Sequence, residues 1–150
     1  MRRILSVVAL CALPVSVLTV GFATTASAAT NVSCSKLSGN ISGTTGKLTK
    51  CSDTANTGGS ATFPISSLTS GSGTITWHGT GTTAVTVSAT PNGGTACAAG
   101  DTEYAVTGTT GASTGAAKKS IKKKSTIGAL VCLSSTGAFT LVPKTDFTIT

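Results

Sequence analysis

The chain has 150 residues, a formal net charge of +7 and only 4% aromatic residues. This length suits a single domain. So few aromatic side chains argue against a sugar-binding cleft with aromatic walls and against stacking on nucleic-acid bases. The only arginines are Arg2 and Arg3, so the rest of the chain lacks the side chain that binds phosphate through two hydrogen bonds. We therefore expect neither a glycosidase nor a specific nucleic-acid-binding protein.

The N-terminal segment has the features of a secretory signal. Arg2 and Arg3 precede the uncharged apolar run Ile4–Val20, and Ala26–Ala28 supplies the small-x-small pattern that a signal peptidase cuts. We predict cleavage after Ala28, so that residues 1–28 are a signal peptide and residues 29–150 form the mature domain. Because no second apolar run reaches membrane-spanning length, we expect a secreted, extracellular protein that is either free or loosely held at the cell envelope.

Four cysteines follow the predicted cleavage site: Cys34, Cys51, Cys97 and Cys132. In an exported protein such cysteines are interpreted first as disulfides, and no C-x-x-C spacing indicates a metal site. Sequential pairing, Cys34 with Cys51 and Cys97 with Cys132, is the simplest of the three possible connectivities. Closing these loops contributes roughly 3 and 4 kcal/mol in the chain-entropy estimate, which compensates for a core that is poor in large apolar side chains. We expect no metal and no cofactor.

Short alternating segments between turns predict eight or nine β-strands. In chain order they lie around Leu37–Ile41, Leu48, Phe63–Ile65, Thr74–His78, Val85–Ala89, Tyr104–Val106, Ile127–Leu133, Phe139–Leu141 and Phe147–Ile149. The turn Gly43–Gly46 is expected to set Ile41 opposite Leu48 in the first hairpin.

No long amphipathic helix is predicted, because Thr and Gly are poor helix formers. The segment 112–119 is the one stretch that could form a short helical turn, but we expect it to be an exposed loop that leads into the lysine-rich edge. The strand pattern predicts an all-β fold, a single β-sandwich stapled by two disulfides. Its architecture would be immunoglobulin-like without the Cys/Trp/Cys signature of that domain.

His78 is the only histidine and therefore the obvious candidate for catalysis. It would act as a general base beside Asp101 or Asp146, with a serine as the nucleophile. No Gly-x-Ser-x-Gly motif accompanies it, and strand alternation places it on the solvent face, opposite a buried Trp77. Asp101 and Glu103 are expected to be solvated acids in a turn. We favour the interpretation that His78 is an exposed, non-catalytic residue.

Five lysines stand within seven positions: Lys118, Lys119, Lys122, Lys123 and Lys124. Such a cluster attracts polyanions, here an anionic cell-wall polymer or an acidic membrane surface. The simpler alternative is that the lysines guard an exposed sheet edge against aggregation. The sequence leaves both interpretations open.

Several turns, cysteines and core positions stand in a recognisable order: Cys34, Gly39–Gly43, Cys51, Thr57–Ser60, Gly73–Trp77, Cys97, Tyr104–Gly108, Val131–Cys132 and Leu141–Pro143. This arrangement resembles a group of small, uncharacterised secreted proteins of actinobacteria. The resemblance implies a compartment and a lineage, but no activity.

Together these features predict a non-enzymatic, secreted binding or structural module that acts at the cell surface. Two alternatives remain: a small hydrolase that uses His78 with an acidic residue, and a carrier or inhibitor. A concave apolar pocket is the feature that would distinguish them.

Overall fold

This computed structural model describes residues 31–150. They contain nine strands and three short helices, joined by turns and loops. The strands are β1 (Val32–Asn40), β2 (Thr45–Cys51), β3 (Ser60–Pro64), β4 (Ser72–Trp77), β5 (Gly81–Pro91), β6 (Thr102–Ser113), β7 (Thr126–Leu133), β8 (Ala138–Leu141) and β9 (Phe147–Ile149). The helices are α1 (Thr54–Thr57), α2 (Ser66–Ser70) and α3 (Ala117–Ser120). The predicted signal peptide, residues 1–28, lies outside the described residues.

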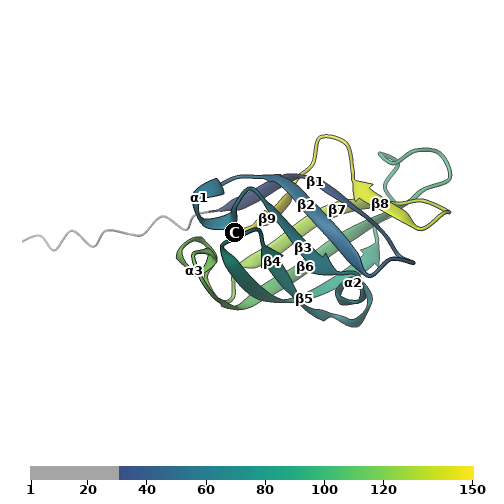
Figure 1. The fold of residues 1–150 in the computed structure, drawn as a ribbon. Coiled ribbons are helices and arrows are strands. Elements are labelled where there is room, and N and C mark those ends of the chain that lie inside the picture. Colours follow the sequence, from purple (N-terminus) through teal and green to yellow (C-terminus); the bar gives the residue numbers. More distant parts are fainter. Residues whose placement is uncertain (1–30) are drawn as a thin grey trace, which may run out of the picture.

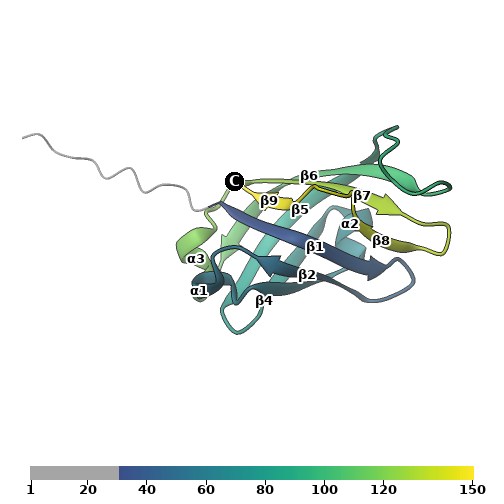
Figure 2. The same ribbon diagram turned by 90° about the horizontal axis from the view of Figure 1, so that it is seen from above.

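The strands form a closed antiparallel barrel (Figures 1 and 2). Each strand from β1 to β8 pairs with the next, and β1 closes the circle by pairing with β2 on one side and with β8 and β9 on the other. Since β8 and β9 both lie between β7 and β1, they fill one strand position in succession, and the barrel has eight positions.

The predicted β-sandwich is therefore wrong. Alternation of apolar and polar residues shows only that each strand has one buried face, and that face can meet a second sheet or the inside of a barrel. Here the register of β1 against β8 and β9 joins the two ends of the sheet, which removes the free edges that an open sheet would have.

The inner face carries the residues that alternation indicated, with one exception. Trp77 is 1% exposed, which confirms its prediction as a core residue. In the first hairpin, however, Leu37 and not Ile41 is the partner of Leu48. The turn begins at Ile41, whose side chain is 54% exposed. The predicted Ile41–Leu48 pair is wrong because β2 already begins at Thr45, which shifts the register of the hairpin.

Two phenylalanines fill the inside of the barrel by lying over glycines. Phe139 is the register partner of Gly39, and Phe63 is the partner of Gly46. A Cβ atom at Gly39 would lie 2.2 Å from the Phe139 ring, and one at Gly46 would lie 2.3 Å from the Phe63 ring. The ring centroids are 6.4 Å apart, so the two rings meet inside the barrel. Glycine is needed at both positions because the rings occupy the space of a side chain.

One end of the barrel is plugged. Helices α1 and α3 lie together at this end in Figure 1, whereas α2 lies at the other. Ala117 and Ile121 are 0% and 2% exposed and belong to the core cluster. Ser120 donates a hydrogen bond from Oγ to Oδ2 of Asp53, which ties α3 to the residue before α1. The exposed loop expected over residues 112–119 is thus partly wrong, since its last residues form a helical turn that caps the core.

Two disulfides are present, and both follow the sequential pairing. Cys34–Cys51 joins register partners on β1 and β2. Cys97–Cys132 fastens the β5–β6 loop to β7. Two disulfides are consistent with a protein of an oxidising compartment. Among residues 31–150, no helix combines the length and apolar character needed to cross a membrane.

Candidate functional site

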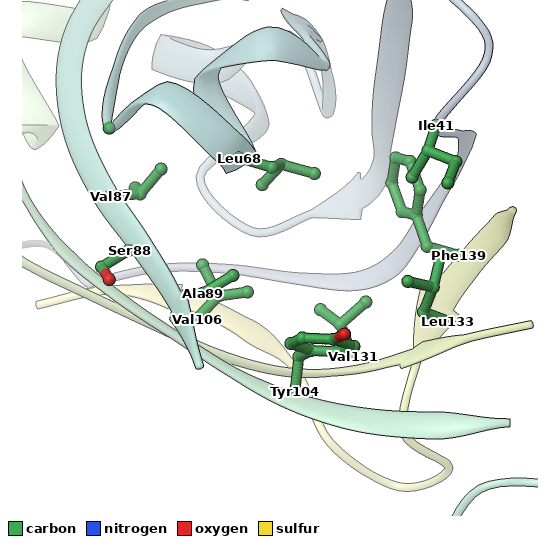
Figure 3. Close-up of a pocket in the computed structure, with 11 residues that line it drawn as sticks. Ile41, Leu68, Val87, Ser88, Ala89, Tyr104, Val106, Val131, Leu133 and Phe139 are labelled. Atoms are coloured by element: carbon green, nitrogen blue, oxygen red, sulfur yellow. The ribbon is translucent and has the colours of Figure 1, made fainter. Parts of the chain in front are cut away.

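A cavity of about 650 Å³ opens at the end of the barrel opposite α1 and α3 (Figure 3). Eleven residues line it: Ile41, Leu68, Gly71, Val87, Ser88, Ala89, Tyr104, Val106, Val131, Leu133 and Phe139. They come from the β1–β2 turn, from α2 and the residue after it, and from β5, β6, β7 and β8. The cavity is therefore built by segments from almost the whole length of the domain.

Strand alternation determines what faces the cavity. On β5, Val87 and Ala89 point inward, and Ser88 between them lies exposed on the outer side. On β6, Tyr104 and Val106 share the inner face, and Tyr104 is the register partner of Val131 on β7. Tyr104 is thus the one lining residue on an inner face that carries a polar side-chain group, and no lining residue is charged.

The Tyr104 ring lies beside Val131 on the cavity wall (Figure 3). The residue is half-buried, and its hydroxyl makes no hydrogen bond to any other residue of the described range 31–150. A tyrosine hydroxyl both donates and accepts, so this group can pair with a polar group of a molecule in the cavity.

A second, smaller void of about 30 Å³ lies among the core residues below the cavity. The residues common to the walls of both spaces are Leu68, Val87, Val106 and Val131. Three of these residues belong to strands, whereas Leu68 belongs to α2 and projects across the opening in Figure 3. Leu68 therefore lies between the open cavity and the core.

The candidate catalytic residues do not come together. His78 is exposed in the β4–β5 turn at the plugged end, whereas Asp101 directly precedes β6 at the open end. Asp146 is also exposed and accepts a hydrogen bond from Ser33 Oγ at 2.6 Å. Within residues 31–150, no hydrogen bond or ion pair connects the His78 side chain to another residue. The predicted exposure of His78 is confirmed.

Glu103 differs from its prediction as a solvated acid. Its side chain is 5% exposed, and Oε1 accepts a hydrogen bond of 2.5 Å from Asn92 Nδ2. Oε2 is buried without a partner within the described residues. The β5–β6 loop causes this burial: Gly94 lies against the carboxylate, and the Cys97–Cys132 disulfide holds the loop beside Glu103, the register partner of Cys132.

The lysine cluster, Lys118, Lys119, Lys122, Lys123 and Lys124, is exposed at the plugged end, on α3 and in the turn that follows it. Thr110 of β6 organises this turn: its Oγ1 donates to the Lys122 carbonyl at 2.5 Å, and its carbonyl accepts from the Lys124 N–H at 2.8 Å. Lys124 adopts a φ of 70°, a conformation that costs a residue with a side chain about 1 kcal/mol. Since these lysines lie on a helical turn and a loop of a closed barrel, they do not guard a strand edge.

No acidic residue neutralises this cluster within the described part of the chain, where no ion pair involves any of its five lysines. Asp53, which approaches α3, has both carboxylate oxygens engaged by Asn56 Nδ2 at 3.0 and 3.1 Å, and one of them also by Ser120 Oγ. The cluster is thus a local excess of positive charge. Residues 31–150 also contain no group of three or more His, Cys, Asp or Glu side chains placed to hold a metal ion.

No protein-family model matches this chain, and no curated protein or solved structure is significantly similar to it.

Proposed function

We propose that this chain is a secreted, non-enzymatic binding protein of the carrier type, which holds one small apolar molecule in the open end of its barrel. The observation that carries this proposal is the uncharged cavity of about 650 Å³. Its volume falls within the range of roughly 300–1,000 Å³ that is typical of small-molecule sites. An eight-stranded barrel has an interior that side chains fill or that accommodates one small ligand.

The apolar lining of the cavity would stabilise a bound apolar ligand. Ile41 is 54% exposed at the rim, so apolar surface faces water when the cavity is empty. Covering such surface contributes about 0.8 kcal/mol for each methylene group that leaves water. Micromolar affinity corresponds to about 8 kcal/mol, and the loss of freedom on binding adds at least about 4 kcal/mol, so the ligand must bury about fifteen or more carbons.

The positions of the polar groups support binding over catalysis. The cavity contains no charged side chain, and His78 lies at the opposite end of the barrel. An acid–base reaction requires its titratable group within hydrogen-bond reach of the reacting atoms, and among the described residues the only titratable group on the cavity wall is the Tyr104 hydroxyl.

Export is part of the proposal. The signal-like residues 1–28 and the two disulfides support maturation outside the cytoplasm. Protein purified from culture medium should begin at Ala29 and contain no free thiol, which intact-mass and peptide mapping under non-reducing conditions would measure. A titratable thiol in that protein would contradict this part of the proposal.

The cavity is tested with an uncharged fluorescent probe, N-phenyl-1-naphthylamine. We expect the folded protein to bind it at micromolar concentration. Ala89→Phe, which fills the cavity from the inner face of β5, should weaken binding at least tenfold. Thr86→Phe adds the same ring on the outer face of the same strand and should leave binding unchanged. Absence of binding by the folded wild-type protein, or equal loss in both variants, would overturn the proposal.

A second candidate function rests on the lysine cluster, for which we propose binding to an anionic, phosphate-rich polymer of the cell envelope. Five unpaired positive charges lie at the plugged end, away from the cavity. A membrane surface is less favoured because the one exposed large apolar side chain of residues 31–150 is Ile41, at the other end of the barrel. With its lysines on such a polymer, the protein would keep its open end toward the solution.

The polymer proposal is tested by retention on immobilised polyphosphate as salt increases. Replacing Lys118, Lys119 and Lys122 with Gln should lower the salt concentration that elutes the protein, since each lysine contact releases counterions. The matched control carries the same change of charge at three lysines outside the cluster: Lys36, Lys47 and Lys144. Equal shifts in the two variants would show that only net charge matters. Stronger retention on phosphatidylglycerol vesicles than on polyphosphate would identify a membrane as the partner instead.

A further inference from the structure

We propose that the occupant of the cavity is an uncharged, single-chain amphiphile, whose polar head pairs with Tyr104 and whose tail points along the barrel axis toward Leu68. This inference rests on the proposed carrier function and assigns a chemical class to its ligand.

Because no charged side chain of residues 31–150 lines the cavity, the site favours an uncharged head group. The chain has four acidic residues and, besides Arg2 and Arg3, nine lysines, but none of these side chains lines the cavity. An ionised carboxylate, phosphate or ammonium that enters this space would lose its hydration without gaining an opposite charge. A hydroxyl, an ester or a primary amide loses much less and needs one hydrogen-bond partner.

Tyr104 provides that partner. It stands on the inner face of β6 near the start of the strand, at the open end of the barrel, and its hydroxyl has no partner within residues 31–150. The remaining inward-facing wall is apolar, so the cavity offers one polar contact near the opening and apolar contacts elsewhere. A molecule with one polar end and one apolar end matches this distribution.

Leu68 limits how deeply the apolar end reaches. It lines both the open cavity and the void of about 30 Å³ below it, a volume close to that of one water molecule. The helical turn that carries Leu68 is fastened by the Ser67 hydroxyl, which donates to the Pro64 carbonyl at 2.6 Å, and by the Leu68 N–H, which donates to the Ile65 carbonyl at 2.9 Å. These bonds fix the backbone that carries Leu68 at the open end, and a tail that extends beyond Leu68 would have to displace its side chain.

The experiment measures displacement of N-phenyl-1-naphthylamine by three series of unbranched molecules, used below their micellar concentrations. These are primary alcohols, carboxylates and trimethylammonium salts of matched chain length. We expect alcohols to bind at least tenfold more tightly than either ion. Tyr104→Phe should weaken alcohol binding about three- to tenfold, as expected for one hydrogen bond, after correction for the affinity of the variant for the probe, which direct titration measures.

The tail is tested with the same alcohols in Leu68→Ala. Removing three carbons at this position connects the two spaces, so the chain length that binds best should increase by two or three carbons. Leu133→Ala removes the same three carbons from the wall of the open cavity only and should not lengthen the preferred chain. Circular dichroism and thermal unfolding establish that each variant is folded.

The outcomes separate the two proposals. If the folded wild-type protein binds neither the probe nor any chain, the carrier function itself fails. If the probe binds but the ions compete as well as the alcohols, or Tyr104→Phe changes nothing, the carrier function stands and the uncharged head group is overturned. If Leu68→Ala and Leu133→Ala show the same preferred chain length as wild type, Leu68 does not set the depth of the site.

Discussion

The buried hydrogen bond between Trp77 and Thr83 gives the sharpest test of the barrel interior. Trp77 is 1% exposed and Thr83 is 0% exposed, and the indole Nε1–H donates to Thr83 Oγ1 at 2.9 Å. Thr83 Oγ1 in turn lies 3.0 Å from Ser113 Oγ. Thr83→Val keeps the shape of the side chain and removes the acceptor, so it leaves a buried N–H without a partner.

We expect Thr83→Val to lower the free energy of unfolding by about 1–3 kcal/mol, the cost of an unsatisfied buried donor. In a Trp77→Phe background no donor remains to be orphaned, so the same change should cost less than about 1 kcal/mol. The two substitutions should therefore couple by about 1–2 kcal/mol in a double-mutant cycle. Thr86→Val, at an exposed position of the same strand, should stay within about 0.5 kcal/mol of wild type.

The assay is urea unfolding with both disulfides intact, followed by far-ultraviolet circular dichroism in all variants. Trp77, the single tryptophan, provides a second signal wherever it is retained. Unchanged m-values would show that the variants unfold with a similar exposure of surface. Additivity of the two substitutions within about 0.3–0.5 kcal/mol would refute the hydrogen bond as the reason for the burial of this pair.

Three further changes test other parts of the fold. Gly39→Ala should destabilise the protein by about 1–3 kcal/mol, because its methyl group would overlap the Phe139 ring, and chemical denaturation would measure the loss. Replacing Cys97 and Cys132 with Ser should lower the free energy of unfolding by up to about 4 kcal/mol, the chain-entropy estimate for a separation of 35 residues. A protease should then cut the β5–β6 loop that the disulfide holds, and an uncut loop would contradict this prediction. Glu103→Gln keeps the hydrogen bond that Oε1 accepts and removes a buried charge, so we expect a gain of about 1 kcal/mol in thermal unfolding. A loss would show that the amide N–H, which replaces the unpartnered Oε2, costs more to bury than the charge.

The local features of the fold follow from the amino-acid sequence alone. Alternation identified strands and their buried faces, and therefore the burial of Trp77, because side-chain direction in a strand depends only on the parity of position. Simple spacing also suggested the two disulfides that the structure contains. The exposure of the lysine cluster follows from charge alone, since lysines are almost never buried without a partner.

The choice between a barrel and a sandwich depends on long-range strand pairing. Both architectures bury one face of each strand, so alternation is identical in the two. The difference lies in the pairing of β1 with β8 and β9, which stand at opposite ends of the domain in sequence. No local pattern encodes a pairing over that separation.

The candidate site could not be predicted from the sequence, because it too depends on long-range strand pairing. In the sequence, Tyr104 is an ordinary strand tyrosine, and Leu68 is a single leucine among serines and a threonine. They become the polar and apolar limits of one cavity only because closure of the barrel brings β6 and α2 to the same opening. The burial of Glu103 likewise could not be predicted, since an acid in a turn is ordinarily solvated. Glu103 is buried because a disulfide holds a neighbouring loop beside it. Local patterns thus determine which way a side chain points, and chain closure determines what it meets there.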